Sequence, residues 1–417
     1  MIERGRELPS LTSSTVRIDD LTSLADLLPP REQLLWLRRG EGMVGFGSAL
    51  RLEFSGANRF EDAARDWRTL AGRATVDDPL GIQGSGLIAF GAFAFSSRSE
   101  APSVLIVPSL VVGRRDGQAW LTRIRLTDDA QPETAVPAPR TPTPIGSVAF
   151  GSGALSPDGY LAAVDAALSR IDSGEPSKVV LARDMVAQLP PGADTAAALA
   201  VLASGYPDCW TFAVDDFLGS SPETLVGVST GTVTARVLAG SAARGVDSAT
   251  DQQASVALAT SAKDQDEHQY AVQSVLAALR PHSPAVTASE MPFTLRLPNL
   301  WHLASDVEGA LADGSSSLDL IGALHPTAAV AGTPTRSAVS LIDELEPFDR
   351  GRYAGPVGWV GSDGDGEWAI ALRCAQIGRD DVLRAYAGAG IVAESVADHE
   401  LAETSLKFRP IIEAFTA

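Results

Sequence analysis

The sequence predicts an α+β fold built from antiparallel sheets. Strand-like runs follow one another directly, a hairpin-type turn separates two of them, and amphipathic helices intervene at irregular intervals. A doubly wound fold would instead alternate strand and helix throughout. The turn, at 362–366 with the sequence Ser-Asp-Gly-Asp-Gly, lies between expected strands at 357–360 and 368–377.

The first part of the chain contains apolar, β-branched runs at 103–107 and 110–112, which are typical of strands. A proline-rich stretch follows at 127–144. Because proline fixes φ and removes a donor, this stretch is expected to be an exposed connection. It marks either a domain boundary or a surface loop within one domain.

Two helices are predicted after this stretch. Ser156 and Pro157 form an N-cap and first helical position, and the apolar spacing that follows continues to Ile171, before Gly174. The second helix spans about 263–280. Further strands are expected where apolar runs recur, at 178–183, 210–217, 232–238 and 382–387.

Composition restricts the possible partners. The 417 residues are 45% hydrophobic, enough for a large core, and carry a net charge of −19, which opposes binding to nucleic acid or an anionic membrane. No apolar run reaches the length of a membrane span, and the charged N-terminus does not resemble a signal peptide. Cys209 and Cys374 lie in apolar runs and are expected to be buried thiols. A cytoplasmic location is therefore predicted.

Two expected helices carry paired carboxylates. Glu400, Glu403 and Lys407 stand at i, i+3 and i+7 behind a glycine-rich segment expected to form a turn, and Asp264 and Glu267 stand three apart. An exposed Glu403–Lys407 ion pair and acid-rich helix capping are the simpler interpretations. Together the pairs indicate an all-oxygen site of the kind that Mg²⁺ occupies.

Other polar residues stand where a structural element would not favour them. Lys178 begins an apolar strand, Glu223 follows a turn, and Arg373 interrupts an apolar run as a carboxylate clamp would. His302 and His325 each lie beside apolar residues. The simpler interpretations are an edge lysine, a solvated loop acid and satisfied core histidines. Combined, these residues predict a magnesium-dependent enzyme that acts on a small anionic acid.

Ordered motifs over about 230 residues resemble those of the chorismate-utilising enzymes, most closely isochorismate synthases. The motifs are Lys178-Val-Val-Leu-Ala-Arg, Phe217-Leu-Gly-Ser-Ser-Pro-Glu-Thr-Leu, Leu238-Ala-Gly-Ser, Lys263-Asp-x-x-Glu-His, Trp301-His-Leu-Ala, Leu324-His-Pro-Thr-Ala-Ala-Val-Ala-Gly-Thr-Pro, Glu346-Pro-Phe-Asp-Arg, Gly366-Glu-Trp-x-x-x-x-Arg-Cys, Gly388-Ala-Gly-Ile and Glu400-x-x-Glu-x-x-x-Lys. The resemblance implies one domain of two antiparallel sheets packed face to face and flanked by helices. Residues 1–150 would be a variable N-terminal part of this fold, and 151–417 the chorismate-binding catalytic region.

The resemblance also implies roles for individual residues. Glu267 and Glu403 would hold Mg²⁺, with Asp264 and Glu400 reaching it through water. Lys178 would be the general base that activates water toward C2 of chorismate, and Glu223 the general acid that protonates the leaving C4 hydroxyl. The residues implied to contact the substrate are Gly240, His302, Ala329, Arg373, Gly388, Ala389, Gly390 and Lys407.

Single positions separate the relatives. Ala239 stands where aminodeoxychorismate synthases carry a nucleophilic lysine, and Ala329 stands where salicylate synthases carry a threonine associated with pyruvate elimination. Ala239 disfavours an aminodeoxychorismate synthase, and Ala329 favours isochorismate as the product. We further expect a monomer that supplies menaquinone or siderophore synthesis. A salicylate synthase and a non-catalytic chorismate-binding relative remain the alternatives.

Overall fold

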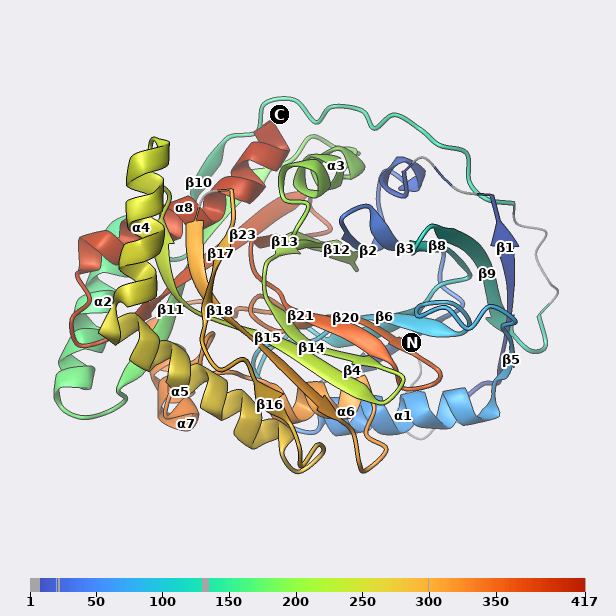
Figure 1. Cartoon of the computed structure of the whole chain (residues 1–417). Coiled ribbons are helices and arrows are strands. Elements are labelled where there is room, and N and C mark those ends of the chain that lie inside the picture. Colours follow the sequence, from blue (N-terminus) through green and yellow to red (C-terminus); the bar gives the residue numbers. More distant parts are fainter. Residues whose placement is uncertain (1–7, 20, 22, 130–134, 299, 417) are drawn as a thin grey trace.

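Two β-sheets stacked face to face, with helices on their outer sides, make up the molecule (Figure 1). The computed structural model describes residues 8–19, 21, 23–129, 135–298 and 300–416. In these residues every strand pair is antiparallel except β1 with β5. The predicted α+β class with two face-to-face antiparallel sheets is confirmed.

The first sheet has 13 strands within the described residues. In spatial order they are β10 (Phe150–Ser152), β11 (Lys178–Gln188), β23 (Val382–Ile391), β22 (Cys374–Ile377), β13 (Phe217–Ser221), β12 (Trp210–Val214), β2 (Leu34–Arg38), β3 (Glu41–Phe46), β8 (Leu110–Arg115), β9 (Gln118–Leu126), β1 (Leu11–Ile18) and β5 (Thr75–Asp77), with β19 (Gly332–Thr333) beside β11.

The second sheet has 10 strands in the same described part of the chain. Their order is β16 (Thr287–Ala288), β18 (Leu300–Ala310), β15 (Thr232–Ala243), β14 (Thr224–Ser229), β21 (Gly366–Ile370), β20 (Pro356–Gly361), β6 (Ile88–Ala92), β7 (Ser103–Val107) and β4 (Leu50–Phe54), with β17 (Phe293–Arg296) beside β18.

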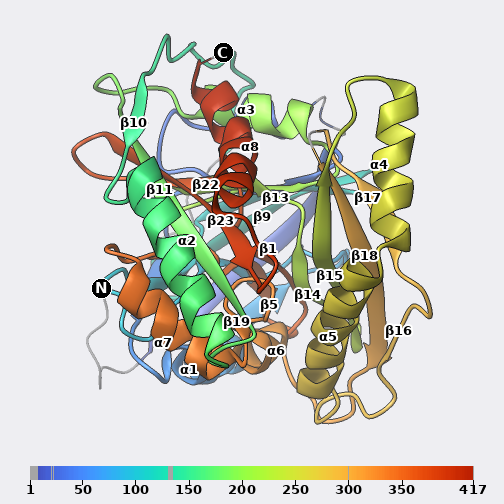
Figure 2. The same ribbon diagram turned by 90° about the vertical axis from the view of Figure 1, so that its left-hand side faces the viewer.

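The helices cover the outer faces of the stack. One set packs on the first sheet: α2 (Pro157–Asp172), α3 (Ala196–Gly205), α7 (Thr335–Leu345) and α8 (Ala397–Thr416). The other packs on the second sheet: α1 (Arg59–Arg73), α4 (Ser248–Thr260), α5 (Ala262–Leu279) and α6 (Ser317–Leu324). A 3-10 turn, η1 (Ala25–Leu27), contacts α3. Figure 2 looks onto the end where α8, β23 and β11 face β15, β18 and α5.

Alternation along the strands builds the core on both sides of the first sheet. Leu34 and Trp36 of β2 join the large core that extends to the second sheet, whereas Leu35 and Leu37 join a separate cluster with Phe408 of α8. Successive strand side chains point to opposite faces, so a strand covered on both faces is apolar throughout.

Strands that lie before the proline-rich stretch pair with strands that lie after it, in both sheets. β2 pairs with β12 in the first sheet, and β6 pairs with β20 in the second. The proline-rich stretch therefore connects strands of one fold. Part of it, 130–134, lies outside the described residues, and 135–149 form neither helix nor strand. The division of function at residue 150 stays a prediction.

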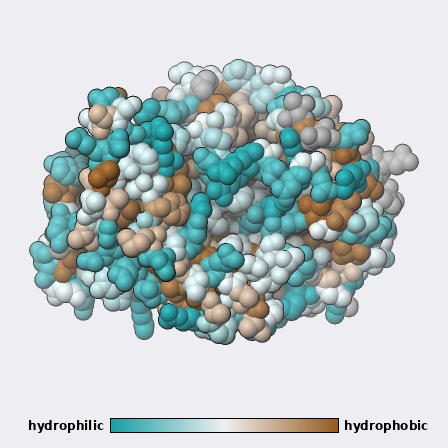
Figure 3. All heavy atoms as spheres, viewed as in Figure 1, coloured by the Kyte–Doolittle hydropathy of each residue, from teal (hydrophilic) through white to brown (hydrophobic). Residues whose placement is uncertain are grey.

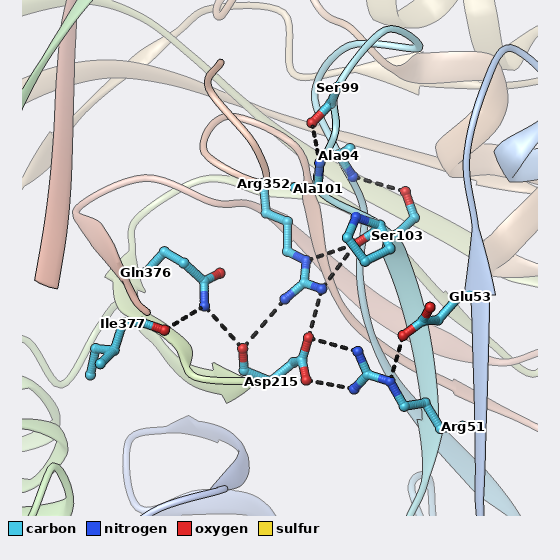
Figure 4. Close-up of polar contacts among 11 residues, drawn as sticks. Arg51, Glu53, Ala94, Ser99, Ala101, Ser103, Asp215, Arg352, Gln376 and Ile377 are labelled. Carbon is cyan, nitrogen blue, oxygen red and sulfur yellow. Dashed lines mark hydrogen bonds and ion pairs between the residues drawn. The ribbon is translucent and has the colours of Figure 1, made fainter. Parts of the chain in front are cut away.

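The strand predicted at 210–217 is instead a hairpin. Asp215 and Asp216 both have positive φ, +58° and +56°, and turn the chain from β12 into β13. The Asp215 carboxylate receives hydrogen bonds from Arg51 and Arg352 (Figure 4). The two-residue turn lacks the glycine that usually marks such turns in a sequence.

Two other local predictions were wrong. The run 368–377 is not one strand: β21 ends at Ile370 in the second sheet and β22 begins at Cys374 in the first, with Arg373 between them at φ +47°. The segment 388–390 is not a turn, because it continues β23 and pairs with β11. By contrast, the start of α2 is as predicted, with the Ser156 side chain accepting from Gly159 N.

The described residues include no helix apolar and long enough to cross a membrane. The face seen in Figure 3 is largely hydrophilic, with hydrophobic residues scattered over it. Cys209 and Cys374 are buried free thiols, as predicted.

Candidate active site

The predicted site residues come together at one end of the sheet stack. All of them except Ala389 line one cavity of about 210 Å³. They are Lys178, Glu223, Gly240, Asp264, Glu267, His302, Ala329, Arg373, Gly388, Gly390, Glu400, Glu403 and Lys407. Residues up to 229 positions apart in sequence, from both sheets and from α5 and α8, thus surround one space. His325, by contrast, is a buried core histidine whose Nε2 bonds to Phe95 O.

The acidic helix faces form as the spacing predicts. Ser261 caps α5 by accepting from Asp264 N at 3.2 Å, which places Asp264 in the first turn and Glu267 one turn later. Glu403 and Lys407 lie one turn apart on α8. α5 approaches the cavity from the second sheet and α8 from the first.

Each of the two carboxylates expected to hold metal is paired with a lysine. Lys178 Nζ donates to Glu267 Oε1, and Lys407 Nζ lies 2.6 Å from Glu403 Oε1. Lys407 Nζ also donates to Gly388 O at 2.8 Å. Burial opposes ionisation of Glu403, but the charge and hydrogen bond of Lys407 outweigh it and lower the pKa of this carboxyl.

The donor set fits magnesium. Asp264, Glu267, Glu400 and Glu403 line the cavity with carboxylates, and the Ser241 hydroxyl donates to Glu403 Oε1 at 3.4 Å. Mg²⁺ is usually held by one or two carboxylates, with waters and substrate oxygens completing its shell. In the described part of the chain no three His, Cys, Asp or Glu residues are close enough to chelate a metal by themselves. Two carboxylates with waters are therefore the arrangement that these residues permit.

Glu223 is a buried acid without a hydrogen-bond donor. It follows β13 and is 6% exposed. Among the described residues, no group donates to its carboxyl oxygens. Burial raises its pKa to about 8, even though the charges of Lys178, Arg373 and Lys407 act in the opposite direction. Glu223 therefore holds a proton at neutral pH and is able to donate it.

Arg373 is a buried cation open to the cavity. It is 8% exposed, and within the described residues its guanidinium makes neither a hydrogen bond nor an ion pair. Burial lowers its pKa. A guanidinium removed from water needs an anionic partner, and its planar donors match a carboxylate. Arg373, which was predicted to bind a substrate carboxylate, therefore lies in the kink between β21 and β22 and not within a strand.

His302 is a hydrogen-bond acceptor in this site. Its Nδ1 lies 3.3 Å from Gly240 O, and because a carbonyl only accepts, Nδ1 carries the proton. Burial and the charges of Arg373 and Lys407 lower the pKa of His302 to about 3, so the ring is neutral. The buried Nε2 has no partner within the described residues and can accept from a ligand hydroxyl.

Gly240 makes this contact possible at an irregular point of β15. The register with β18 shifts between Leu238 and Ser241, and Gly240 lies there with φ +80°. A Cβ at this position would also stand 3.3 Å from Asp264 Cβ. The backbone conformation at this position therefore favours glycine, and a larger side chain would crowd α5 where it packs against β15.

Gly388 and Gly390 turn their backbone groups away from β11. Their register partners Ala182 and Val180 donate to Glu346 Oε1 and Ala331 O instead of to β23. Alternation therefore directs the N–H groups of both glycines toward the other edge, where Lys407 contacts Gly388 O. Ala389 lies between them; its side chain is fully buried and does not line the cavity.

The sequence interpretation missed several lining residues, among them Tyr353 and Ser395. Tyr353 stacks on Tyr386 with centroids 5.2 Å apart, and a Cβ on Gly388 would lie 3.0 Å from its hydroxyl. Tyr353 stands three residues after the motif that ends at Arg350, so extending that motif is the signal that would have found it. For Ser395, nothing in the sequence points to the cavity.

Comparison with known proteins assigns the family. The family profile described as chorismate binding enzyme matches residues 3–416. The chain belongs to the chorismate-binding enzymes. It is 42% identical over 270 residues to the isochorismate synthase DhbC of Bacillus subtilis, covering 62% of this chain and 68% of that one. It is 36% identical to a putative isochorismate synthase MenF of Mycobacterium tuberculosis, covering 79% and 87%.

The fold has the same relatives. The crystal structure of a putative 2,3-dihydroxybenzoate-specific isochorismate synthase, DhbC of Bacillus anthracis, superposes with a TM-score of 0.77 at 31% identity, covering 94% of this chain and 98% of that one. As a chorismate-binding enzyme, the chain presents a cavity with an unpaired guanidinium, a protonated carboxyl and paired carboxylates, which suits a small dicarboxylic acid that undergoes acid–base chemistry.

Proposed function

We propose that this protein is an isochorismate synthase, which adds water at C2 of chorismate while the C4 hydroxyl leaves. The observation that carries the proposal is that Lys178 and a protonated Glu223 line the same cavity. The reaction needs one group that takes a proton from water and another that gives a proton to the departing oxygen. The names of the similar proteins support the same activity.

The residues divide the reaction between them. Lys178, as the general base, removes a proton from the attacking water as the new C2–O bond forms. The ring double bonds shift, the C4–O bond breaks, and Glu223 gives its proton to the departing hydroxyl, which leaves as water. His302 Nε2 accepts from a substrate hydroxyl and orients the ring.

The anionic groups of the substrate are held at two places. Arg373 binds one carboxylate, assisted by Lys407 and by the N–H groups of Gly388 and Gly390. Bound Mg²⁺ would neutralise the other carboxylate and favour electron flow toward it. Glu267 and Glu403 would hold the ion, with Asp264 and Glu400 reaching it through water.

Ala329 lines the cavity with a methyl group, so no hydroxyl is offered there. This supports isochorismate over salicylate as the released product. We place the enzyme in the cytoplasm as a monomer that supplies menaquinone or siderophore synthesis.

The test is chromatography of chorismate incubated with the purified protein and Mg²⁺. Isochorismate is expected as the main product, with little salicylate or pyruvate. Mainly salicylate and pyruvate would establish the salicylate synthase alternative, and unchanged chorismate would establish a non-catalytic relative.

A further inference from the structure

The two lysine–carboxylate pairs of the site are not equivalent. Lys407 is fixed twice, by Glu403 and by Gly388 O. Among the described residues, Lys178 Nζ has Glu267 as its hydrogen-bonding partner and no other. Gly390 leaves room for it, since a Cβ there would lie 3.0 Å from Lys178 Cε. The Lys178 side chain is 14% exposed and Glu267 26%, so solvent screens this pair only partly.

The ammonium of Lys178 and a metal ion require the same oxygen. A divalent cation bound at Glu267 would face a positive charge within hydrogen-bond distance of its ligand, and like charges so close repel strongly where water is scarce. Lys407 also lies beside an expected metal ligand, Glu403, but Gly388 O offers it a second acceptor that it can keep when a metal binds that carboxylate.

We propose that Lys178 is an internal competitor of the metal, so that Mg²⁺ and the ammonium exchange at Glu267 and metal binding releases Lys178 toward the substrate. This inference rests on the proposed function, in which Glu267 holds the ion. It predicts that removing the lysine strengthens metal binding, whereas removing an ordinary binding residue would weaken it.

The test is titration of the purified protein with Mn²⁺ in the absence of chorismate, by calorimetry and by electron paramagnetic resonance of free Mn²⁺. If the pair occupies about nine-tenths of the molecules, Lys178→Met should bind Mn²⁺ about tenfold more tightly than the wild type. Lys178→Gln provides a second variant, and thermal unfolding checks that each is folded.

Lys263→Met is the matched control. Lys263 also lines the cavity and loses the same charge, but it pairs with Glu394 at 3.8 Å instead of with an expected metal ligand. The affinity of Lys263→Met for Mn²⁺ should differ from that of the wild type by less than about threefold, because solvent screens the charge of Lys263. In protein that already carries Glu267→Gln, adding Lys178→Met should not increase the affinity for Mn²⁺ further.

The inference is overturned if both Lys178 variants bind Mn²⁺ no more tightly than Lys263→Met, or if the gain persists without Glu267. The chorismate assay of the wild-type protein reports separately on the proposed function. If the wild-type protein leaves chorismate unchanged while Lys178→Met binds Mn²⁺ more tightly, the proposed isochorismate synthase activity is refuted. The competition between Lys178 and the metal would still hold.

Discussion

Two carboxylates flank strand β13, and they differ in whether the protein supplies them with hydrogen-bond donors and counter-charges. Asp215 precedes the strand and receives Arg51 Nη2 at 3.0 Å and Arg352 Nη2 at 2.7 Å (Figure 4). Glu223 follows the strand and, among the described residues, receives no donor. Burial raises the pKa of both carboxyls, but the guanidinium partners reverse its effect at Asp215, whereas at Glu223 burial prevails.

The difference shows how one fold separates a structural charge from a reactive group. At Asp215 the protein itself supplies the counter-charges, so the ionised form joins β4, the β12–β13 turn and Arg352. Within the part of the chain that the structure describes, Glu223 receives no donor, and the nearby Arg373 guanidinium has neither a hydrogen bond nor an ion pair. Both groups remain available to a ligand, at a cost to stability that is common in active sites.

The largest expected effect is on catalysis. Glu223→Gln should reduce kcat for isochorismate formation by about 10³-fold, because an amide cannot supply the proton. Asp215→Asn should retain near-normal kcat per folded molecule. Steady-state assays of both variants check this, and a Glu223→Gln enzyme with more than a tenth of wild-type kcat would contradict the assigned role.

The next effect is on stability, where the order of the two variants reverses. Asp215→Asn should lower the free energy of unfolding by about 1–3 kcal/mol, because Arg352 would lose its buried counter-charge. Glu223→Gln should leave it unchanged or raise it at neutral pH. Urea unfolding followed by fluorescence measures both, and equal losses would show that the two carboxylates do not differ as described.

The third effect is the pH dependence of these differences. Because burial raises the pKa of Glu223, the folded protein keeps its proton until about pH 8, whereas the unfolded chain loses it near the ordinary pKa of 4.5. Rising pH through this window therefore favours unfolding of the wild type but not of Glu223→Gln, so the variant's relative stability should increase.

For Asp215 the sign is opposite. Its folded pKa lies below the unfolded value of 3.8, so its contribution is present above that pH and is lost on acidification. The stability difference between wild type and Asp215→Asn should therefore shrink as pH falls below 3.8. Parallel slopes for the two variants would refute the comparison.

The helical parts of the site were predictable because helix spacing fixes which side chains share a face. Asp264 with Glu267, and Glu403 with Lys407, needed only local periodicity. Motif resemblance then placed residues from distant segments together, which no local pattern does.

The errors arose where tertiary structure overrides an apolar run. The segment 368–377 is apolar except at Arg373 and Gln376, because each half is largely buried in a different sheet. Gly388 and Gly390 suggested a turn, but they serve to make room for Tyr353 and Lys178. Such contacts lie between segments far apart in the sequence.

The most direct test is the ionisation of Glu223 itself. Carbon-13 NMR of protein labelled at glutamate Cδ, with Glu223→Gln to assign the resonance, measures the titration of this carboxyl. We expect a carboxyl that is protonated at pH 7 and titrates near pH 8. A resonance that titrates near 4.5 would contradict it, because Glu223 would then have no proton to give.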